Sequence, residues 1–201
     1  IASILASGDT RLPGLAPQAQ LYAASVFEED AQQGEIASTV NLVRALDWLL
    51  ASGVDTINLS LAGPPNRLLE VALKQVKSQG VVVLAAAGNG GPLARPKYPA
   101  AYDSVVAVTA VDMNGKVFRL ANRGDYLDIA APGVNVRHAV PGGGFAASSG
   151  TSFAVPFATV AAARLRQRDP SLDVVASLYA STVDLGPPGR DDIYGYGLLR
   201  P

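Results

Sequence analysis

The sequence predicts an α/β fold with a mainly parallel sheet and right-handed βαβ crossovers. Residues 81–87 form a continuous apolar run that begins with three valines. Such a run is typical of a strand covered on both faces. Around it, segments with strand character alternate with segments of helical spacing, and this order is typical of βαβ units. Because no repeat or linker divides the chain, we expect residues 1–201 to form one domain.

The individual elements follow from apolar periodicity and from the residues that end each segment. Val40, Val43 and Leu46 recur at helical spacing, and Gly53 ends that pattern. The predicted helices cover residues 1–7, 35–52, 66–79, the stretch after Ser152, and 171–180. The predicted strands cover residues 20–27, 54–61, 81–87, 104–111, 126–130 and 194–199. Residues 28–34 are predicted to form an acidic loop.

The composition limits the classes of function. The chain is 49% hydrophobic and 16% charged, which indicates a large core and a lightly charged surface. A formal net charge of -1 gives no reason to expect nucleic acid or an anionic membrane as a partner. The absence of cysteine excludes a disulfide, a thiolate metal site and a cysteine nucleophile. The carboxylates are scattered without the spacing of a metal site, so we expect no metal and no other cofactor.

In an open α/β sheet, ligands bind at the carboxyl ends of the strands. One segment of interest there is Gly150-Thr151-Ser152, directly before an apolar, Ala-rich run. Gly150 allows a sharp turn, and Ser152 stands where a helix begins. A helix N-terminus offers free N–H groups and partial positive charge, which suit an oxygen that becomes anionic. Taken alone, Ser152 is either a helix cap or a nucleophile.

Two further segments follow predicted strands. Residues 88–91 read Gly-Asn-Gly-Gly, which is typical of a dinucleotide-type turn, of a plain loop, or of Asn89 acting as a neutral donor to an oxyanion. The dinucleotide reading is disfavoured because prolines follow instead of a helix. Residues 60–62 are either an ordinary strand end or an exposed edge that pairs with an extended peptide.

The only histidine, His138, lies fourteen residues before Ser152, next to a Gly-rich stretch. A serine nucleophile needs a base, which is usually a histidine. We nevertheless interpret His138 as a surface-loop or strand-end residue. No Gly-x-Ser-x-Gly motif occurs and no histidine follows Ser152, so an α/β-hydrolase is disfavoured.

Several motifs, in one order, resemble the subtilisin-like serine peptidases (subtilases). Residues 150–156 (GTSFAVP) are similar to the Gly-Thr-Ser-Met-Ala-x-Pro nucleophile motif of that family. Residues 83–89 resemble the strand that ends in the oxyanion asparagine. Residues 58–63 resemble the Asn-x-Ser-Leu-Gly segment that lines the first specificity pocket and pairs with substrate. The likeness extends over nearly the whole chain, and several motifs in order are more specific than any single one.

The resemblance implies a three-layer fold and a serine endopeptidase that uses an acyl-enzyme mechanism. It implies that Ser152 is the nucleophile and Asn89 the oxyanion donor. The residues it implies for substrate binding are Ser60, Leu61, Ala62, Ala87 and Gly88. It further implies a polypeptide substrate and a secreted, periplasmic or cell-envelope location. Calcium binds some members of the family, but the loop of residues 7–15 is short, so we expect no tight calcium site here.

In this family the triad runs Asp, His, Ser, and the histidine precedes an apolar helical run. Residues 1–6 (IASILA) resemble that run. We therefore expect the histidine and aspartate to precede Ile1, so that this chain is the C-terminal portion of a catalytic domain and is inactive alone. The alternatives are a non-catalytic peptide-binding pseudoenzyme and a fragment that a separate N-terminal segment complements. An exposed sheet edge would also favour self-association.

Three details bear on specificity. Ala62 stands where the family usually has glycine, which would crowd the substrate strand. Residues 32–34 are expected to form one wall of the cleft. Lys97 lies in the short loop that contributes to the first pocket. Our hypothesis is that Lys97 favours an acidic or polar substrate residue there, and the alternative is that it points to solvent.

Overall fold

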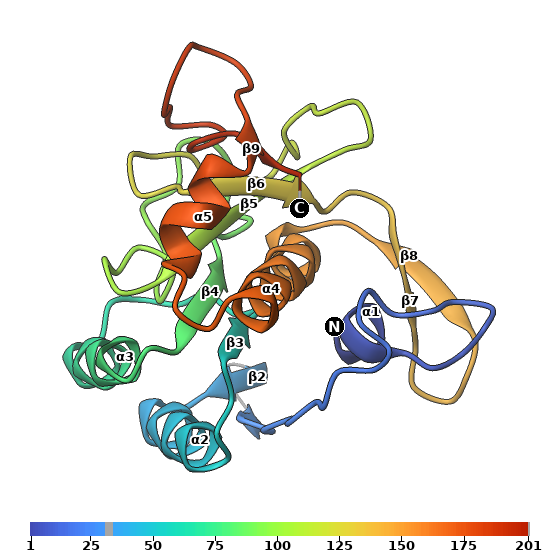
Figure 1. Ribbon diagram of the computed structural model, residues 1–201, viewed down its shortest axis with the longest axis vertical. Coiled ribbons are helices and arrows are strands. Elements are labelled where there is room, and N and C mark those ends of the chain that lie inside the picture. The colour runs from blue at the N-terminus through green and yellow to red at the C-terminus, as the bar shows by residue number, and fades with distance from the viewer. Residues whose placement is uncertain (31–33, 201) are drawn as a thin grey trace.

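The computed structural model describes residues 1–30 and 34–200, and a six-stranded sheet runs through its centre (Figure 1). In spatial order, its strands are β3 (Thr56–Leu59), β4 (Val82–Ala86), β5 (Val106–Val111), β6 (Ile129–Pro132), β10 (Leu198–Leu199) and β9 (Thr182–Val183). Every neighbouring pair from β3 to β10 is parallel, and β9 is antiparallel to β10. The mainly parallel sheet expected from the sequence is therefore confirmed.

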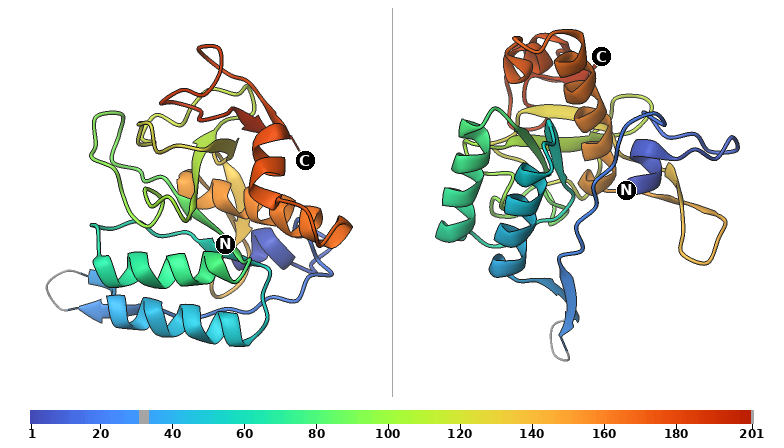
Figure 2. Two further views of the ribbon diagram at one scale, coloured as in Figure 1. Left: turned by 60° about the vertical axis from the view of Figure 1, so that its left-hand side comes forward. Right: turned by 60° about the horizontal axis from the view of Figure 1, so that its bottom comes forward.

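Helices cover both faces of this sheet. α2 (Thr39–Ala51) and α3 (Arg67–Ser78) lie side by side on one face, as both views of Figure 2 show. α4 (Thr151–Arg168) crosses the other face, with α5 (Val174–Ala180) and the short α1 (Ala2–Ala6) beside it. The result is the three-layer α/β arrangement.

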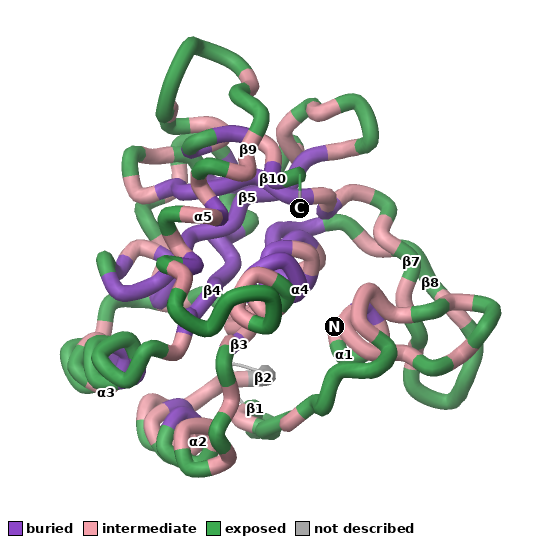
Figure 3. The backbone as a smooth tube through the Cα atoms, in the orientation of Figure 1, coloured by how far each residue is buried: buried purple, intermediate pink, exposed green. Residues whose placement is uncertain are grey.

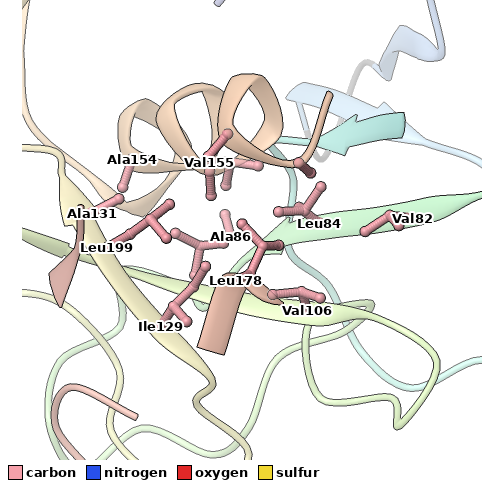
Figure 4. Close-up of a cluster of buried hydrophobic side chains, with 14 of the residues drawn as sticks. Val82, Leu84, Ala86, Val106, Ile129, Ala131, Ala154, Val155, Leu178 and Leu199 are labelled. Carbon is pink, nitrogen blue, oxygen red and sulfur yellow. The ribbon is translucent and has the colours of Figure 1, made fainter. Parts of the chain in front are cut away.

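Alternation along the strands explains why residues 81–87 are apolar throughout. On β4, Leu84 and Ala86 pack on the α4 side, while Val83 and Ala85 pack on the side of α2 and α3. All five β4 residues are buried, and Figure 3 shows burial concentrated in the central strands and α4. Figure 4 shows the α4-side cluster, where β-branched and leucine side chains of the sheet meet Ala154 and Val155. A strand covered on both faces needs no polar side.

α4 is almost entirely buried in its first three turns, which accounts for its small residues. Ala154, Ala158, Ala161 and Ala162 are at most 1% exposed and allow the helix to lie close to the sheet. The predicted central buried helix is thus confirmed, and it contains Pro156 within its span.

The starts of α2 and α3 follow from side-chain caps. Ser38 accepts a hydrogen bond from the Asn41 N–H, and Asn66 accepts one from the Leu69 N–H. α2 therefore begins at residue 39, and the helix predicted from residue 35 was wrong in its first turn. Residues 34–37 instead form β2 (Gly34–Ala37), which pairs with β1 (Phe27–Asp30). The predicted acidic loop is in part this antiparallel ribbon. Residues 31–33 lie outside the described residues, and they include residues 32 and 33 of the cleft wall expected over 32–34.

The strand predicted for residues 20–27 was also wrong. Residues 20–26 belong to no strand, and the only strand residue of the range is Phe27. Tyr22 packs edge-on against Trp48 of α2, with ring centroids 5.9 Å apart. The residues have strand composition, but a ladder requires a paired neighbour, and among the described residues this segment has none.

The structure adds an antiparallel hairpin that periodicity did not reveal. β7 (Val136–Ala139) pairs with β8 (Phe145–Ser148), and Gly142, Gly143 and Gly144 take positive φ in the turn. β9 was likewise not predicted, and the strand predicted over 194–199 is confined to β10. These strands are two to four residues long, too short for a period of two to stand out.

A polar cluster fastens the C-terminal loop to the sheet. Asp128 is 9% exposed and accepts from the Ala107 N–H at 2.9 Å and from Arg190 at 3.3 Å. Burial raises the pKa of the Asp128 carboxyl, and the Ala107 N–H and the Arg190 charge partly offset that effect.

Among the helices of residues 1–30 and 34–200, none has both the length and the apolar character that a membrane-spanning helix requires.

Candidate active site

Ser152 is the second residue of α4 and is half-buried. Gly150 occupies the N-cap and makes no side-chain cap bond. The Ser152 hydroxyl does not cap the helix, because it donates to the carbonyl oxygen of Ser60 at 3.2 Å. The cap interpretation of Ser152 is therefore wrong, and its side chain faces the segment that follows β3.

Asn89 lies beside this serine with its amide oriented. Its Oδ1 accepts from the backbone N–H of Thr151 at 3.0 Å and from the Thr151 hydroxyl at 3.1 Å. Its Nδ2 then points toward Gly150, where a Cβ atom would lie 3.1 Å from that nitrogen. Among the described residues no acceptor binds Nδ2. The result is a neutral N–H donor held next to Ser152, a geometry that suits a developing oxyanion.

Thr151 links the segment that follows β4 to the start of α4, a connection that sequence reasoning missed. It is fully buried, and its Oγ1 accepts from the Gly88 N–H at 3.1 Å. The end of β4 is thus bonded to the first residue of α4. The sequence signal that could have indicated Thr151 is its position between Gly150 and Ser152 in the nucleophile motif.

The other residues predicted to bind substrate lie in the two segments that Ser152 and Thr151 contact. Ser60, Leu61 and Ala62 directly follow β3, and the next residue, Gly63, forms an isolated antiparallel bridge with Tyr98. Gly63 N–H donates to Tyr98 O at 2.7 Å, and Tyr98 N–H donates to Gly63 O at 3.0 Å. Ala62 is exposed, so the segment is open to solvent at that residue.

Ala87 and Gly88 are buried and follow β4. Gly88 has φ of +110°, and a Cβ there would lie 3.1 Å from Lys97 Cγ and 2.9 Å from Asn122 Nδ2. The half-buried Lys97 therefore lays its aliphatic stem against Gly88. Asn122, which sequence reasoning missed, accepts from the Gly90 N–H at 2.7 Å and donates to Arg95 O at 3.2 Å. Asn122 therefore holds residues 90–95 at both ends of that segment.

His138 lies on β7, and the hydrogen bonds of its ring go to neighbours other than Ser152. Its Nε2 is 2.8 Å from Ser148 Oγ and its Nδ1 is 3.0 Å from Ala139 O. Its ring lies 5.1 Å from the ring of Phe153, centroid to centroid. Within residues 1–30 and 34–200, no imidazole or carboxylate forms a hydrogen bond with Ser152 Oγ, whose bond goes to Ser60 O. The described residues also contain no cluster of three or more His, Cys, Asp or Glu that fits a metal ion.

Comparison with known proteins identifies this arrangement. The model of the Subtilase family (Peptidase_S8) matches residues 1–197. The chain belongs to the subtilase family. It is 38% identical over 188 residues to Subtilisin BL of Lederbergia lenta, covering 93% of this chain and 68% of that protein. It is 36% identical over 193 residues to the Minor extracellular protease Epr of Bacillus subtilis, covering 94% of this chain but 29% of that protein.

Solved protease structures are similar to this chain in fold, which agrees with its membership of the subtilase family. A psychrophilic protease, S41, superposes with a TM-score of 0.86 at 30% identity, covering 98% of this chain and 74% of that one. The S218A mutant of the PatA protease domain gives a TM-score of 0.85 at 29% identity, covering 99% and 75%. This subtilase chain therefore has the fold of these peptidases but spans only part of its relatives' length. Together the matches support a serine peptidase.

Proposed function

We propose that this chain carries three parts of a secreted serine endopeptidase: the nucleophile, the oxyanion donor, and the segment of residues 60–62 that pairs with the substrate, here called the substrate edge. The observation that carries the proposal is the Asn89 amide, whose oxygen is fixed by Thr151 and whose N–H beside Ser152 has no acceptor among the described residues. A carbonyl carbon attacked by Ser152 Oγ would place its oxygen between Asn89 Nδ2 and the Ser152 backbone N–H. A base would take the Ser152 Oγ proton as the new C–O bond forms a tetrahedral intermediate, and would give it to the amine as the C–N bond breaks. The product is an acyl-enzyme, which water hydrolyses.

The substrate would be an extended polypeptide that adds as a strand to Ser60, Leu61 and Ala62. The substrate side chain before the scissile bond would lie against Ala87, Gly88 and Lys97. We propose no metal or other cofactor for the chemistry, and no nucleic acid or membrane as a partner. A secreted or cell-envelope location is consistent with a relative whose name calls it extracellular.

We further propose that the base comes from a polypeptide outside these 201 residues and that the chain alone is inactive. Ser152 Oγ donates to a backbone carbonyl instead of to an imidazole, and loss of the base costs several orders of magnitude in rate. A chain without a base that still binds peptide is the pseudoenzyme alternative.

One observation favours complementation by a separate segment. β3 is the edge of the six-stranded sheet. A groove of about 710 Å³ separates its start from residues 15–22, which belong to no strand, and α4 forms the third wall of this groove. An unpaired strand edge is a template for another strand. An added strand there would lie between β3 and residues 20–22 and would remove the edge that otherwise promotes self-association.

Chemical rescue tests the proposed function. Hydrolysis of an activated peptide ester is expected to rise with imidazole concentration, because free imidazole replaces the base. The Ser152→Ala variant is the control and is expected to show only the rate of imidazole in solution. Equal rates for the chain and its Ser152→Ala variant would refute the peptidase. If the Ser152→Ala variant nevertheless binds peptide, that result would favour the pseudoenzyme.

Lys97 is expected to set the preference of the first pocket. Its stem lies against Gly88, so its ammonium group can approach an acidic substrate side chain. In the imidazole-supported assay, an ester with Glu before the scissile bond is expected to react roughly threefold faster than its Gln analogue, as for an exposed ion pair of ~0.2–1 kcal/mol. Lys97→Met is expected to remove the difference, and Lys116→Met, on a distant loop, to keep it. An unchanged preference in Lys97→Met would mean that the lysine points to solvent.

A further inference from the structure

Ser60 and Ser152 exchange two hydrogen bonds, in which each hydroxyl donates to the other residue's carbonyl oxygen. Ser60 Oγ donates to Ser152 O at 3.0 Å, and Ser152 Oγ donates to Ser60 O at 3.2 Å. The two residues are 92 positions apart in the chain. This pair therefore joins the end of β3 directly to the first turn of α4.

The Ser152 carbonyl is available for this bond because of Pro156. In an α-helix the carbonyl of residue i accepts from the N–H of residue i+4, and for Ser152 that residue is Pro156. Proline has no N–H, yet α4 continues through it to Arg168. The Ser152 carbonyl thus lacks its helical donor at a half-buried position, where an unpaired acceptor is costly. The Ser60 hydroxyl supplies the donor.

Asn58 sets the direction of the Ser60 proton. Its Nδ2 donates to Ser60 Oγ at 2.8 Å. A hydroxyl has one proton and accepts through its lone pairs, so the Ser60 proton remains for Ser152 O. Thr159 of α4 approaches Asn58 from the other side, with Oγ1 3.5 Å from Oδ1. The order Asn58-x-Ser60 therefore has a physical reason, because the first residue orients the hydroxyl of the second.

We propose that Ser60 is a positioning residue whose hydroxyl replaces the helical hydrogen bond that Pro156 omits. By this bond the first turn of α4, with Ser152, is fixed against the segment on which the peptide is proposed to lie. Nucleophile and substrate edge then move as one unit. The proposal rests on the proposed function only where it names Ser152 the nucleophile, since the bond network does not depend on catalysis.

A double-mutant cycle in denaturant unfolding tests the bond itself, without activity. Ser60→Ala leaves Ser152 O unpaired and is expected to raise the unfolding equilibrium constant roughly tenfold. In the Pro156→Ala background residue 156 has an N–H that bonds this carbonyl, so the same change is expected to cost roughly twofold. Ser60→Thr keeps the hydroxyl and is expected to stay within roughly twofold of the wild type. Equal losses in both backgrounds would overturn the proposal.

The acylation rate of Ser152 in the imidazole-supported assay gives the second readout. Ser60→Ala is expected to slow it roughly tenfold, as a small misplacement of a nucleophile does, with recovery in Ser60→Thr. Ser78→Ala removes another hydroxyl-to-carbonyl bond, on α3, and is expected to leave the rate unchanged. If wild-type Ser152 never reacts, the peptidase proposal fails while the unfolding cycle still decides this one. If Ser152 reacts and Ser60→Ala reacts equally fast, the positioning role is overturned.

Discussion

Asn89→Ala is expected to slow acylation of Ser152 by about 10²- to 10³-fold in the imidazole-supported assay, the usual loss for one oxyanion donor. The Asn89 Nδ2 donor is unpaired among the described residues, so it stabilises only charge that develops during reaction. The ground state loses no bond from that nitrogen. We therefore expect the loss to fall on the rate of acylation and to leave the affinity for a non-reacting peptide unchanged.

Asn89→Asp is the matched control for this prediction. Its carboxylate still accepts from the Thr151 N–H and hydroxyl, so the start of α4 keeps both bonds. It has no N–H, so acylation is expected to be at least as slow as in Asn89→Ala. Asn89→Ala additionally leaves Thr151 N–H without its acceptor and is expected to unfold at lower denaturant concentration than Asn89→Asp. Wild-type rates in both variants would remove Asn89 from the mechanism.

Gly195→Ala is expected to lower the free energy of unfolding by about 3 kcal/mol or more. Gly195 has φ of +63°, and a Cβ there would lie 2.2 Å from the backbone oxygen of Asp128. The backbone of Asp128, directly before β6, cannot yield as a flexible side chain can, so the loop must move away from it. The bond from the Tyr196 N–H to Asp128 O, 2.7 Å long, would be lost with it. Denaturant unfolding measures the change.

Gly189→Ala separates the clash from the backbone strain. Gly189 lies in the same C-terminal loop with φ of +86°, but no atom lies within 4 Å of the position of its Cβ. This variant is expected to lose only about 1 kcal/mol, the cost of a non-glycine residue in that conformation. If Gly195→Ala were no worse than Gly189→Ala, the close approach to Asp128 would be contradicted.

Where a residue pattern depends on burial alone, the sequence was sufficient to predict structure. β4 is buried along its whole length and α4 over most of its first three turns, and the composition of both segments shows it directly. Apolar spacing located α2 and α3 to within a few positions, and the caps Ser38 and Asn66 set where these helices begin in the structure. Residues 20–26 failed because strand composition does not reveal whether a partner strand lies alongside.

The sequence indicated several residues of the candidate site but none of the hydrogen bonds between them. Motif order indicated Ser152, Asn89 and the 60–62 segment. The two hydrogen bonds between Ser60 and Ser152 join residues 92 positions apart, and no local pattern in either segment predicts them. Thr151 and Asn122 act by long-range bonds of the same kind. His138 was interpreted as a surface-loop or strand-end residue, and its bonds to Ser148 and Ala139 hold it on the β7–β8 hairpin.

Ser152 is proposed to be a nucleophile without a base in this chain, and intact mass spectrometry with a fluorophosphonate probe checks both parts of that proposal. For the purified chain alone we expect an unchanged mass, and with imidazole a single adduct that maps to Ser152. An adduct on Ser152 of the chain alone, without imidazole, would contradict the absence of a base and direct attention to His138. A lack of adduct under both conditions would contradict the assignment of Ser152 as the nucleophile.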